Sequence, residues 1–552
     1  MTPTADVVFH NGAVFTGSGA PLRDRAVVVT DGVIRDIIPN ARMAAYVGES
    51  TIVVDLEGGL LSPGFQDAHI HPVQGGVEML QCDLTDTRSA AEAIDRIASY
   101  ADAHPDEPWI VGGGWSMGHF PGGAPSALLI DDVIADRPVA LNSRDHHSLW
   151  VNSAALSLAG IGPDSPDPAD GVIERLPNGA PTGTLHEGAL RLVEAHLPAV
   201  SAEKLTAGLL AAQTRLIALG ITGWQDALIG DYAGFPDTRV AYERAIADGT
   251  LRVRVRGAQW WQRDRGLEQL DNLIRGRADA AALGRADRYS LGTVKIMVDG
   301  IAENFTAAMR EPYRDACGRD THNRGKSFIS SERLAEYAIA LDRAGFQIHF
   351  HALGDRAVHD ALNALAAART VNGPTDLRHH LAHLQVVAPG DVSRFAGLGA
   401  VANIQALWAC HGDQIDKLTL PYMPESAQKR QYPFGDLVRS ETPLAAGSDW
   451  PVSSADPIAA AHVAVNRAVP GSDRPPLGGD EQRLELADFF AACTSGAARV
   501  NHWESRTGTI RRGYDADLIT ISPNPFDVAE ASIDESRVTS TWIRGERVYS
   551  TA

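Results

Sequence analysis

The chain has 552 residues, which is too long for one compact core and indicates two or three domains. Its net charge of −20 disfavours nucleic acid and anionic membranes as partners, and no stretch approaches the ~20 apolar residues that span a bilayer. The N-terminus lacks a leader pattern, and the four cysteines, which form no close pair, indicate neither a disulfide framework nor a cysteine zinc site. We therefore expect a soluble cytoplasmic protein with reduced thiols.

Both ends of the chain are predicted to be rich in β-strands. Short β-type runs near the N-terminus are separated by the hairpin signals Asn11-Gly12 and Asp31-Gly32. The same pattern returns over Asp517–Ile521 and Val538–Ile543. We therefore predict one discontinuous β-sandwich domain, composed of residues 1–62 and 500–552.

The middle of the chain alternates predicted strands with helical stretches such as Ala202–Leu219 and Ser331–Ala344. The predicted strands are Leu60–His71, Ile221–Ala227, Leu251–Ala258, Thr293–Val298, Phe346–His351, His380–Leu384, Ala400–Ile404 and Leu444–Ser448. Repeated strand–helix units predict a parallel sheet, and eight of them favour a closed (β/α)₈ barrel. We assign residues 63–75 and 205–499 to this α/β barrel.

The interval between the first two predicted strands is far longer than one helix requires. Residues 76–204, which are rich in glycine and proline, are therefore predicted to form an inserted α/β subdomain that covers the active site.

The strongest chemical signal is Pro63–Pro72, in which His69 and His71 stand two positions apart on a predicted strand. Alternate residues of a strand point to the same face, so both imidazoles would face inward at the carboxyl end of a barrel strand. Two such rings on a rigid strand form a good chelate for a borderline metal such as zinc.

Further candidate ligands stand where later strands end. His351 closes the fifth predicted strand, His383 the sixth, and Asp449 follows the eighth. Core histidines and a helix-capping aspartate would explain any one of these residues, but they explain the whole set poorly, because this rim is where barrel enzymes carry out catalysis. His349 shares the face of His351 one layer deeper, and we interpret it as a packing or supporting residue.

The fourth predicted strand carries Lys295 inside an apolar run, which is costly unless the amine is paired or chemically altered. One solution is carboxylation by carbon dioxide, which gives a carbamate that bridges two metals. The alternative is an unmodified lysine that pairs with Asp299 or Asp449 beside a single metal.

Taken together, these segments resemble the amidohydrolase superfamily, and within it the amidohydrolase-3 or YtcJ-like branch, which includes N-substituted formamide deformylases. The resemblance extends over nearly the whole chain, in the segments Asp6–Phe15, Pro63–Pro72, Gly112–Trp115, Arg144–Ser153, Gly220–Gly223, Val294–Gly300, His351–Asp355, Gly447–Pro451 and Gly513–Asp517. It implies a TIM-like metal-dependent hydrolase barrel. Two departures, Ala382 in place of an acidic residue and the unusual segment Ile301–Thr306, weaken any transfer of the substrate.

The resemblance also implies a site. It implies a divalent metal, with zinc as the first expectation and one or two ions, and Asp449 as the catalytic acid/base. The implied metal-binding residues are His69, His71, Lys295, His351, His383 and Asp449. A bound metal lowers the pKa of its water from 15.7 towards ~7, and the ligating histidines must be neutral, so activity should fall in acid.

Substrate selection is expected from an aromatic wall and from one histidine of the insert. The predicted substrate-binding residues are His147, Trp115, Trp260, Trp408 and Trp450. Tryptophans of this kind suit an apolar or aryl substituent. The alternative is that they only pack loops onto the barrel.

The leading functional hypothesis is hydrolysis of a C–N bond in a small amide, N-formyl compound or cyclic amide. The alternatives are deamination, ester hydrolysis or decarboxylation at the same metal site, or a metal-binding scaffold without turnover. The expected partner is a small-molecule substrate, and homo-oligomers, which are common in this superfamily, are the one protein partnership left open.

Overall fold

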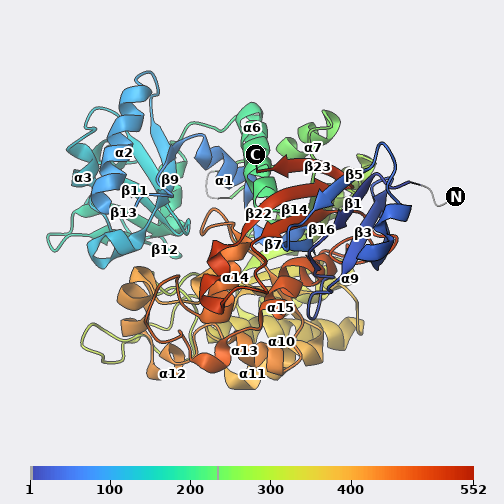
Figure 1. Ribbon diagram of the computed structural model, residues 1–552. Helices are drawn as coiled ribbons and strands as arrows, with labels where there is room; N and C mark the ends of the chain where they lie inside the picture. The colour runs from blue at the N-terminus through green and yellow to red at the C-terminus, as the bar shows by residue number, and fades with distance from the viewer. Residues whose placement is uncertain (1–3, 233–234, 552) are drawn as a thin grey trace.

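The computed structural model describes residues 4–232 and 235–551, so the parts of the predicted terminal domain at residues 1–3 and 552 lie outside the described residues. A central barrel is flanked by a lobe formed by the insert, at the left of Figure 1, and by strands from both termini, at the right. Across the described residues, no helix is both long and apolar enough to traverse a bilayer.

The predicted (β/α)₈ barrel is confirmed. Within the described residues, eight strands form one parallel sheet whose spatial order is their order in the chain. They are β7 (Phe65–Ile70), β14 (Ile221–Ile229), β15 (Arg254–Trp260), β16 (Tyr289–Met297), β17 (Gln347–Ala352), β18 (His380–His383), β19 (Val401–Ile404) and β20 (Leu444–Ala446). All eight overlap the predicted strands.

Helices cover the outside of the barrel. They are α1 (Pro72–Met79), α6 (Ala202–Ala218), α7 (Arg239–Ala247), α8 (Leu270–Ala282), α9 (Ser331–Arg343), α10 (Asp355–Asn372), α11 (Pro389–Leu398), α12 (Glu425–Gln428), α13 (Phe434–Arg439), α14 (Pro457–Asn466), α15 (Leu486–Ala491) and α16 (Ala497–Val500). Two of them begin where the sequence predicts, because the side chains of Ser201 and Ser330 accept hydrogen bonds from the first turns of α6 and α9.

The barrel closes between β20 and β7 through residues that follow β20. The Asp449 N–H donates to the His69 carbonyl at 2.8 Å, and the His71 N–H donates to the Trp450 carbonyl at 2.9 Å. The approach is so close that a Cβ atom on Gly447 would lie 2.6 Å from the Cβ atom of His69, so only glycine fits there.

The first predicted strand, Leu60–His71, needs a correction. It is two strands that belong to different sheets: β6 (Leu60–Pro63) pairs with β21 (Leu518–Ser522), whereas β7 belongs to the barrel. The change occurs at Gly64, where a Cβ atom would lie 2.4 Å from the Thr222 side chain. The dipeptide Pro63-Gly64 interrupts the sequence at this point, a break signal that the prediction of one continuous strand did not use.

Strands from both chain ends lie side by side, as the blue and red arrows of Figure 1 show. One sheet has the order β4 (Val33–Pro39), β3 (Arg25–Thr30), β1 (Val7–His10) and β5 (Ile52–Asp55). The other has the order β2 (Ala13–Val14), β6, β21, β22 (Arg537–Ile543) and β23 (Glu546–Ser550). Side chains of both sheets, including Phe9 and Trp542 with ring centroids 5.2 Å apart, share one buried cluster.

The insert forms its own mixed sheet between β7 and β14. Its strand order is β12 (Gly171–Arg175), β13 (Pro181–Glu187), β11 (Ser148–Val151), β10 (Val139–Ser143), β9 (Ile110–Trp115) and β8 (Cys82–Asp83). Its helices are α2 (Ala90–Ala103), α3 (Ala127–Asp131), α4 (Ser153–Leu158) and α5 (Arg191–Glu194).

Helix α1 follows His71 directly and is held against α6 by two glycines. A Cβ atom on Gly76 would lie 1.9 Å from the Gly208 carbonyl oxygen, so the two backbones meet without side chains between them.

We expect Gly76→Ala to lower the free energy of unfolding by about 1–3 kcal/mol or more, because the added methyl group meets rigid backbone. The control is Gly397→Ala in α11, where a Cβ atom would meet nothing within 4 Å and which should be neutral or slightly stabilising. Thermal denaturation followed by circular dichroism checks this, and equal melting temperatures for both variants would contradict the tight contact.

Candidate metal centre

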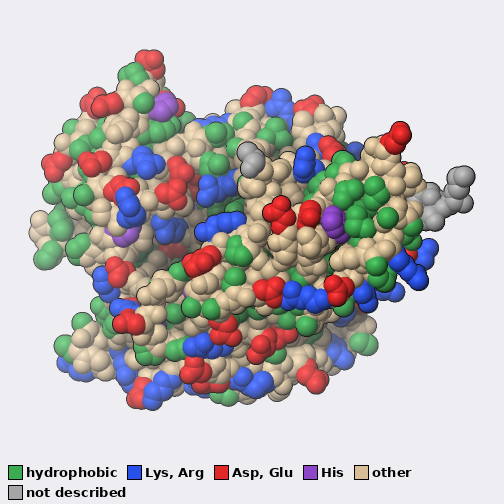
Figure 2. All heavy atoms as spheres, viewed as in Figure 1, with side chains coloured by type: hydrophobic (Ala, Val, Ile, Leu, Met, Phe, Trp, Pro, Cys, Tyr) green, Lys and Arg blue, Asp and Glu red, His purple; other side chains and the backbone are tan. Residues whose placement is uncertain are grey.

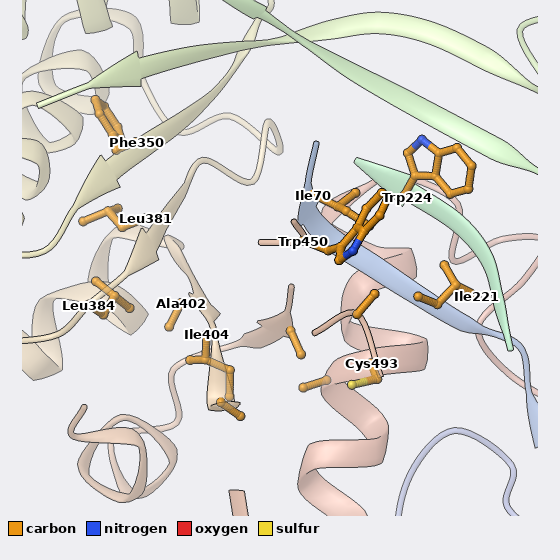
Figure 3. Close-up of a cluster of buried hydrophobic side chains, with 14 of the residues drawn as sticks. Ile70, Ile221, Trp224, Phe350, Leu381, Leu384, Ala402, Ile404, Trp450 and Cys493 are labelled. Carbon is orange, nitrogen blue, oxygen red and sulfur yellow. The ribbon is translucent and has the colours of Figure 1, made fainter. Parts of the chain in front are cut away.

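Three side chains converge at the closure of the barrel. His69 lies in β7, His71 follows it, and the Nε2 atom of each lies 3.0 Å from Oδ1 of Asp449. Between them Ile70 points the other way, into the buried cluster of Figure 3, where it lies near Trp450 and Trp224. The alternation predicted from the sequence therefore places both imidazoles on the inner face.

Two further histidines face this group across the barrel mouth. The rings of His351, in β17, and His383, at the end of β18, have centroids 4.5 Å apart. Nδ1 of His383 lies 3.9 Å from Oδ2 of Asp449, and its ring stacks on Trp408 at 5.1 Å. All five predicted histidine and aspartate ligands are thus brought together.

His383 and Asp449 both adopt left-handed backbone conformations, with φ of 81° and 56°. Such conformations cost on the order of 1–3 kcal/mol and persist only where the surroundings hold them. Here the His383 N–H donates to Oε1 of Gln405 at 2.8 Å, and the Asp449 N–H is held by β7. Strain of this kind concentrates at functional sites.

Lys295 projects from β16 into the same space. Its Nζ lies 3.4 Å from Nε2 of His69, and no carboxylate of the described residues lies within ion-pair distance of it. Burial lowers the pKa of Lys295 to about 7, so a large share of the amine is neutral, which is the form that reacts with carbon dioxide. Asp299 does not pair with it, because its carboxylate accepts the N–H groups of Ala308, Leu353 and Gly354.

Burial controls the charge of the cluster. Desolvation, and then the nearby Lys295, lower the pKa of His69 to about 3, and desolvation holds those of His351 and His383 well below 6.5. Burial alone would raise the pKa of Asp449, but the imidazoles of His69 and His71 outweigh it and hold that pKa well below its usual range. The centre therefore holds an ionised carboxylate beside the neutral imidazoles of His69, His351 and His383.

These residues fit a divalent metal. Nδ1 of His71 and Nδ1 of His383 are buried, with no hydrogen-bond partner in the part of the chain described. Ligand atoms of His69, His383 and Asp449 lie within 4.8 Å of one another. Neutral imidazole nitrogens with a carboxylate oxygen are a donor set that suits zinc and similar ions.

A small cavity of about 70 Å³ opens onto the cluster. Residues of the barrel and of the insert line it together: Gln74, Asp145, His146, His147, Leu228, Tyr232, Trp260, Met297, Ile301, Trp408 and Val452, besides the cluster itself. Of the tryptophans predicted to contact substrate, Trp260 and Trp408 are therefore at the cavity. Trp260 is the last residue of β15.

The expectation for Trp115 and Trp450 is corrected. Trp115 is fully buried in the core of the insert, where its Nε1 donates to the Leu141 carbonyl. Trp450 is buried on the outer side of β7, against Gly75 and near Trp224 (Figure 3). Both pack the fold and do not line the cavity.

His147 reaches the cavity from the insert and is paired with a buried carboxylate. Its Nδ1 lies 3.0 Å from Oε1 of Glu187, which also accepts the hydroxyl of Thr306 from the barrel at 2.7 Å. Burial opposes protonation of His147, but Glu187 outweighs burial and raises its pKa to about 9. His147 is therefore a cation at neutral pH.

Among the described residues, three larger cavities share lining residues with the small one, and the two largest of them have no lining residue in common. A cavity of about 870 Å³ shares His146, Tyr232 and Trp260 with it, and another of about 560 Å³ shares Trp408 and Ile301, among others. On the face drawn in Figure 2 a recess separates the lobe of the insert from the rest, and acidic and basic side chains are interspersed over both. The metal centre is thus a narrow waist between two spaces.

Sequence reasoning missed several residues of the site. Glu187 was not singled out, because it lies in the insert far from His147 in the chain and carries no motif. Tyr232 lies in the loop after β14, where no sequence motif indicates a functional residue. His146, the neighbour of His147 in the insert, lines the cavity, and its Nδ1 lies 2.9 Å from the side-chain nitrogen of Gln74.

Known proteins were compared with the chain. A family model described as "Amidohydrolase family" matches residues 52–549. The protein LONG AFTER FAR-RED 3 of Arabidopsis thaliana is 30% identical over 99% of this chain and 92% of its own length. The putative amidohydrolase YtcJ of Bacillus subtilis is 29% identical, over 98% of this chain and 99% of its own.

A further relative is the N-substituted formamide deformylase of Arthrobacter pascens, which is 25% identical over 100% of this chain and 99% of its own. Among solved structures, an uncharacterized metal-dependent hydrolase from Pyrococcus horikoshii OT3 matches with a TM-score of 0.71 and 22% identity, over 95% of this chain and 99% of its own. At that identity the structural likeness shows the fold alone.

We expect metal-stripped protein to take up zinc, at one or two ions per chain, and His71→Ala to lower that number, because the substitution removes one of the converging nitrogens. The control is His359→Ala in α10, which removes a partly exposed imidazole that pairs with Asp391 outside the cavity. Equilibrium dialysis followed by elemental analysis gives the stoichiometry.

Equal zinc content in wild-type protein and His71→Ala would contradict the site. Two ions per chain, with one lost in Lys295→Ala, would favour the carbamate, and one ion unaffected by that substitution would favour the unmodified lysine.

Proposed function

The chain belongs to the amidohydrolase family, in its YtcJ-like branch, and we propose that it is a metal-dependent hydrolase that cleaves a C–N bond in a small amide-like substrate. The observation that carries the proposal is the convergence of His69, His71 and Asp449 with His351 and His383 at the carboxyl ends of barrel strands. The relative named N-substituted formamide deformylase supports a C–N bond as the target.

His69, His71 and Asp449 would hold one ion, and His351 and His383, with Lys295, a second. The bound metal would lower the pKa of its water and polarise the scissile carbonyl. Asp449, ionised and central to the cluster, would accept a proton from the attacking water and return it to the leaving nitrogen. His147, protonated and on the opposite wall, would donate a hydrogen bond to the carbonyl oxygen as negative charge develops there.

The shape of the site supports a substrate with substituents on both sides of the scissile bond. The reacting group would occupy the narrow waist, with one substituent beside Trp260 and Tyr232 and the other beside Trp408. Aromatic walls favour apolar or aryl substituents. This geometry favours an N-substituted amide over an N-formyl compound, whose acyl side carries only a hydrogen. Assays of matched N-aryl formamides, acetamides and benzamides would test this preference, because kcat/KM should be lowest for the formamides.

We expect Asp449→Asn to lower kcat by about 10²–10⁴-fold, because the amide keeps the shape of the carboxylate but removes the base. Zinc content should be largely retained, since the other ligands remain. Turnover and metal content are measured on the same preparations.

The matched control is Asp342→Asn, which neutralises another buried aspartate that pairs with a histidine, His379, at 3.0 Å, but lies outside the cavity. It should leave kcat unchanged. Turnover of Asp449→Asn close to that of the control would mean that the proton is handled elsewhere.

The alkaline limb of the pH profile of kcat/KM should lie near pH 9. His147 is protonated below its pKa of about 9, so its hydrogen bond is available at neutral pH and is lost as pH rises through about 9. The acid limb should lie well below pH 6.5, because His69, His351 and His383 release their protons far below that value.

Glu187→Gln should move the alkaline limb to lower pH, because it removes the carboxylate that favours protonated His147. The control is Glu174→Gln, which removes the partner of His186 elsewhere in the insert. A pH profile of kcat/KM for the three proteins distinguishes them, and an unmoved limb in Glu187→Gln would exclude His147 as its source.

A further inference from the structure

The barrel interior beneath the metal centre is polar, although barrel interiors are usually filled by branched apolar side chains. Six fully buried polar side chains occupy it, and they come from β14, β16, β17, β18 and β19: Gln225, Thr293, Gln347, His349, His380 and Asn403. Buried polar groups are costly unless they are hydrogen-bonded, so each of these side chains is expected to have a partner. Because some partner atoms can only accept, they determine which atom donates in each bond.

The network is anchored at the bottom by Gln347. Its Nε2 lies 2.9 Å from the Arg378 carbonyl oxygen and 2.7 Å from that of Val500. Carbonyl oxygens only accept, so the amide nitrogen must face them. Oε1 of Gln347 therefore faces the other way and accepts from Thr293 Oγ1 at 2.8 Å and from Gln225 Nε2 at 3.2 Å.

This anchor sets the orientation of Gln225. Because its Nε2 donates to Gln347 and to Asn501, its Oε1 faces two imidazoles, with Nδ1 of His349 at 2.8 Å and Nε2 of His380 at 3.0 Å. An amide oxygen has no hydrogen to give, so both of these ring nitrogens carry one. His380 is consistent with this, since its other nitrogen accepts from Asn403 at 3.2 Å.

His349 connects Gln225 to the metal centre, because it contacts Gln225 through Nδ1 and His69 through Nε2. It is fully buried without an acidic hydrogen-bond partner among the described residues, so it is neutral, and its hydrogen is already on Nδ1. Its Nε2 must therefore accept, and it lies 2.8 Å from Nδ1 of His69. Lys295 Nζ, which lies 3.5 Å from Nε2 of His349, is also a donor.

We propose that Gln225 and His349 are positioning residues that hold the hydrogen of His69 on Nδ1 and leave the lone pair of Nε2 free for a metal. Nε2 of His69 is the atom that converges with His71 on Asp449 Oδ1. In the metal-free chain Nε2 of His69 also faces the Asp449 carboxylate, which can only accept, so His69 takes this tautomer when a metal replaces that contact, and this part rests on the proposed function. The hydrogen on Nδ1 of His349 stands on the geometry of the metal-free chain alone.

The test measures zinc affinity of metal-stripped protein by competition with a chromogenic chelator. His349→Phe, which removes the acceptor at similar size, should weaken zinc binding by about 10–100-fold, as loss of such a supporting hydrogen bond does in other metal sites. His349→Gln should retain most of the affinity, because its amide oxygen can accept from His69. Gln225→Leu should weaken binding as well.

Gln213→Leu is the matched control for lost packing. Gln213 is buried in α6 and bonds the backbone of Thr250 and Arg252, away from the centre. It should bind zinc as wild type does. Loss of affinity in His349→Phe no larger than in Gln213→Leu would overturn the proposal, as would equal affinities of His349→Phe and His349→Gln.

A second readout follows the hydrogen itself. In protein labelled with ¹⁵N-histidine, the ring of His349 should show its hydrogen on Nδ1 in metal-free wild type and a mixture of both tautomers in Gln225→Leu. In zinc-loaded wild type the ring of His69 should show its hydrogen on Nδ1 as well. If wild type binds no zinc, the proposed function fails while this spectrum still decides the inference. A hydrogen on Nε2 of His349 in metal-free wild type would overturn it.

Discussion

The site depends on the way in which the barrel closes. Strand ladders join the other neighbouring strands, but β20 and β7 are joined by backbone bonds of Asp449 and Trp450 to His69 and His71. Three of the four residues whose backbones close the barrel, His69, His71 and Asp449, therefore also carry side chains that would hold the metal. Asp449 cannot move away from the two imidazoles unless the barrel opens, so the stability of the fold and the geometry of the centre rest on the same contacts.

Burial then determines which groups at the centre carry charge. Desolvation keeps His69, His351 and His383 neutral, and a neutral imidazole is the form that binds a metal. His147 is the exception, because Glu187 stands beside it. The cavity therefore presents an anionic Asp449 on one wall and a cationic His147 on another, which is a suitable arrangement for moving a proton on one side of a carbonyl group and stabilising charge on the other.

The fold and the convergence of the proposed ligands could be predicted because both follow local patterns. His69 and His71 alternate along one strand, and Asp449 stands where an apolar run stops, so each can be assigned from its neighbours. Gln225 could not be found in this way, since its partners come from strands distant in the chain and a glutamine in an apolar run does not reveal its bonds. Trp115 and Trp450 were misassigned because proximity to a motif does not determine whether a large aromatic side chain faces the cavity or the core.

The barrel contributes the proposed metal ligands, and the insert contributes His147 and part of the cavity wall. The residues proposed to hold the metal are therefore separate from many of those that would select the substrate. The proposed ligands lie on barrel strands or directly after them, where rigid backbone and the buried polar network hold them. His147 and its partner Glu187 come from the insert, which is tied to the barrel loop after β16 through Thr306 and through the bond from Asn304 to the His147 carbonyl. Changes in the insert can therefore alter the cavity walls and the placement of the cation without disturbing the metal ligands. A scaffold divided in this way can keep one hydrolytic mechanism while its substrates vary.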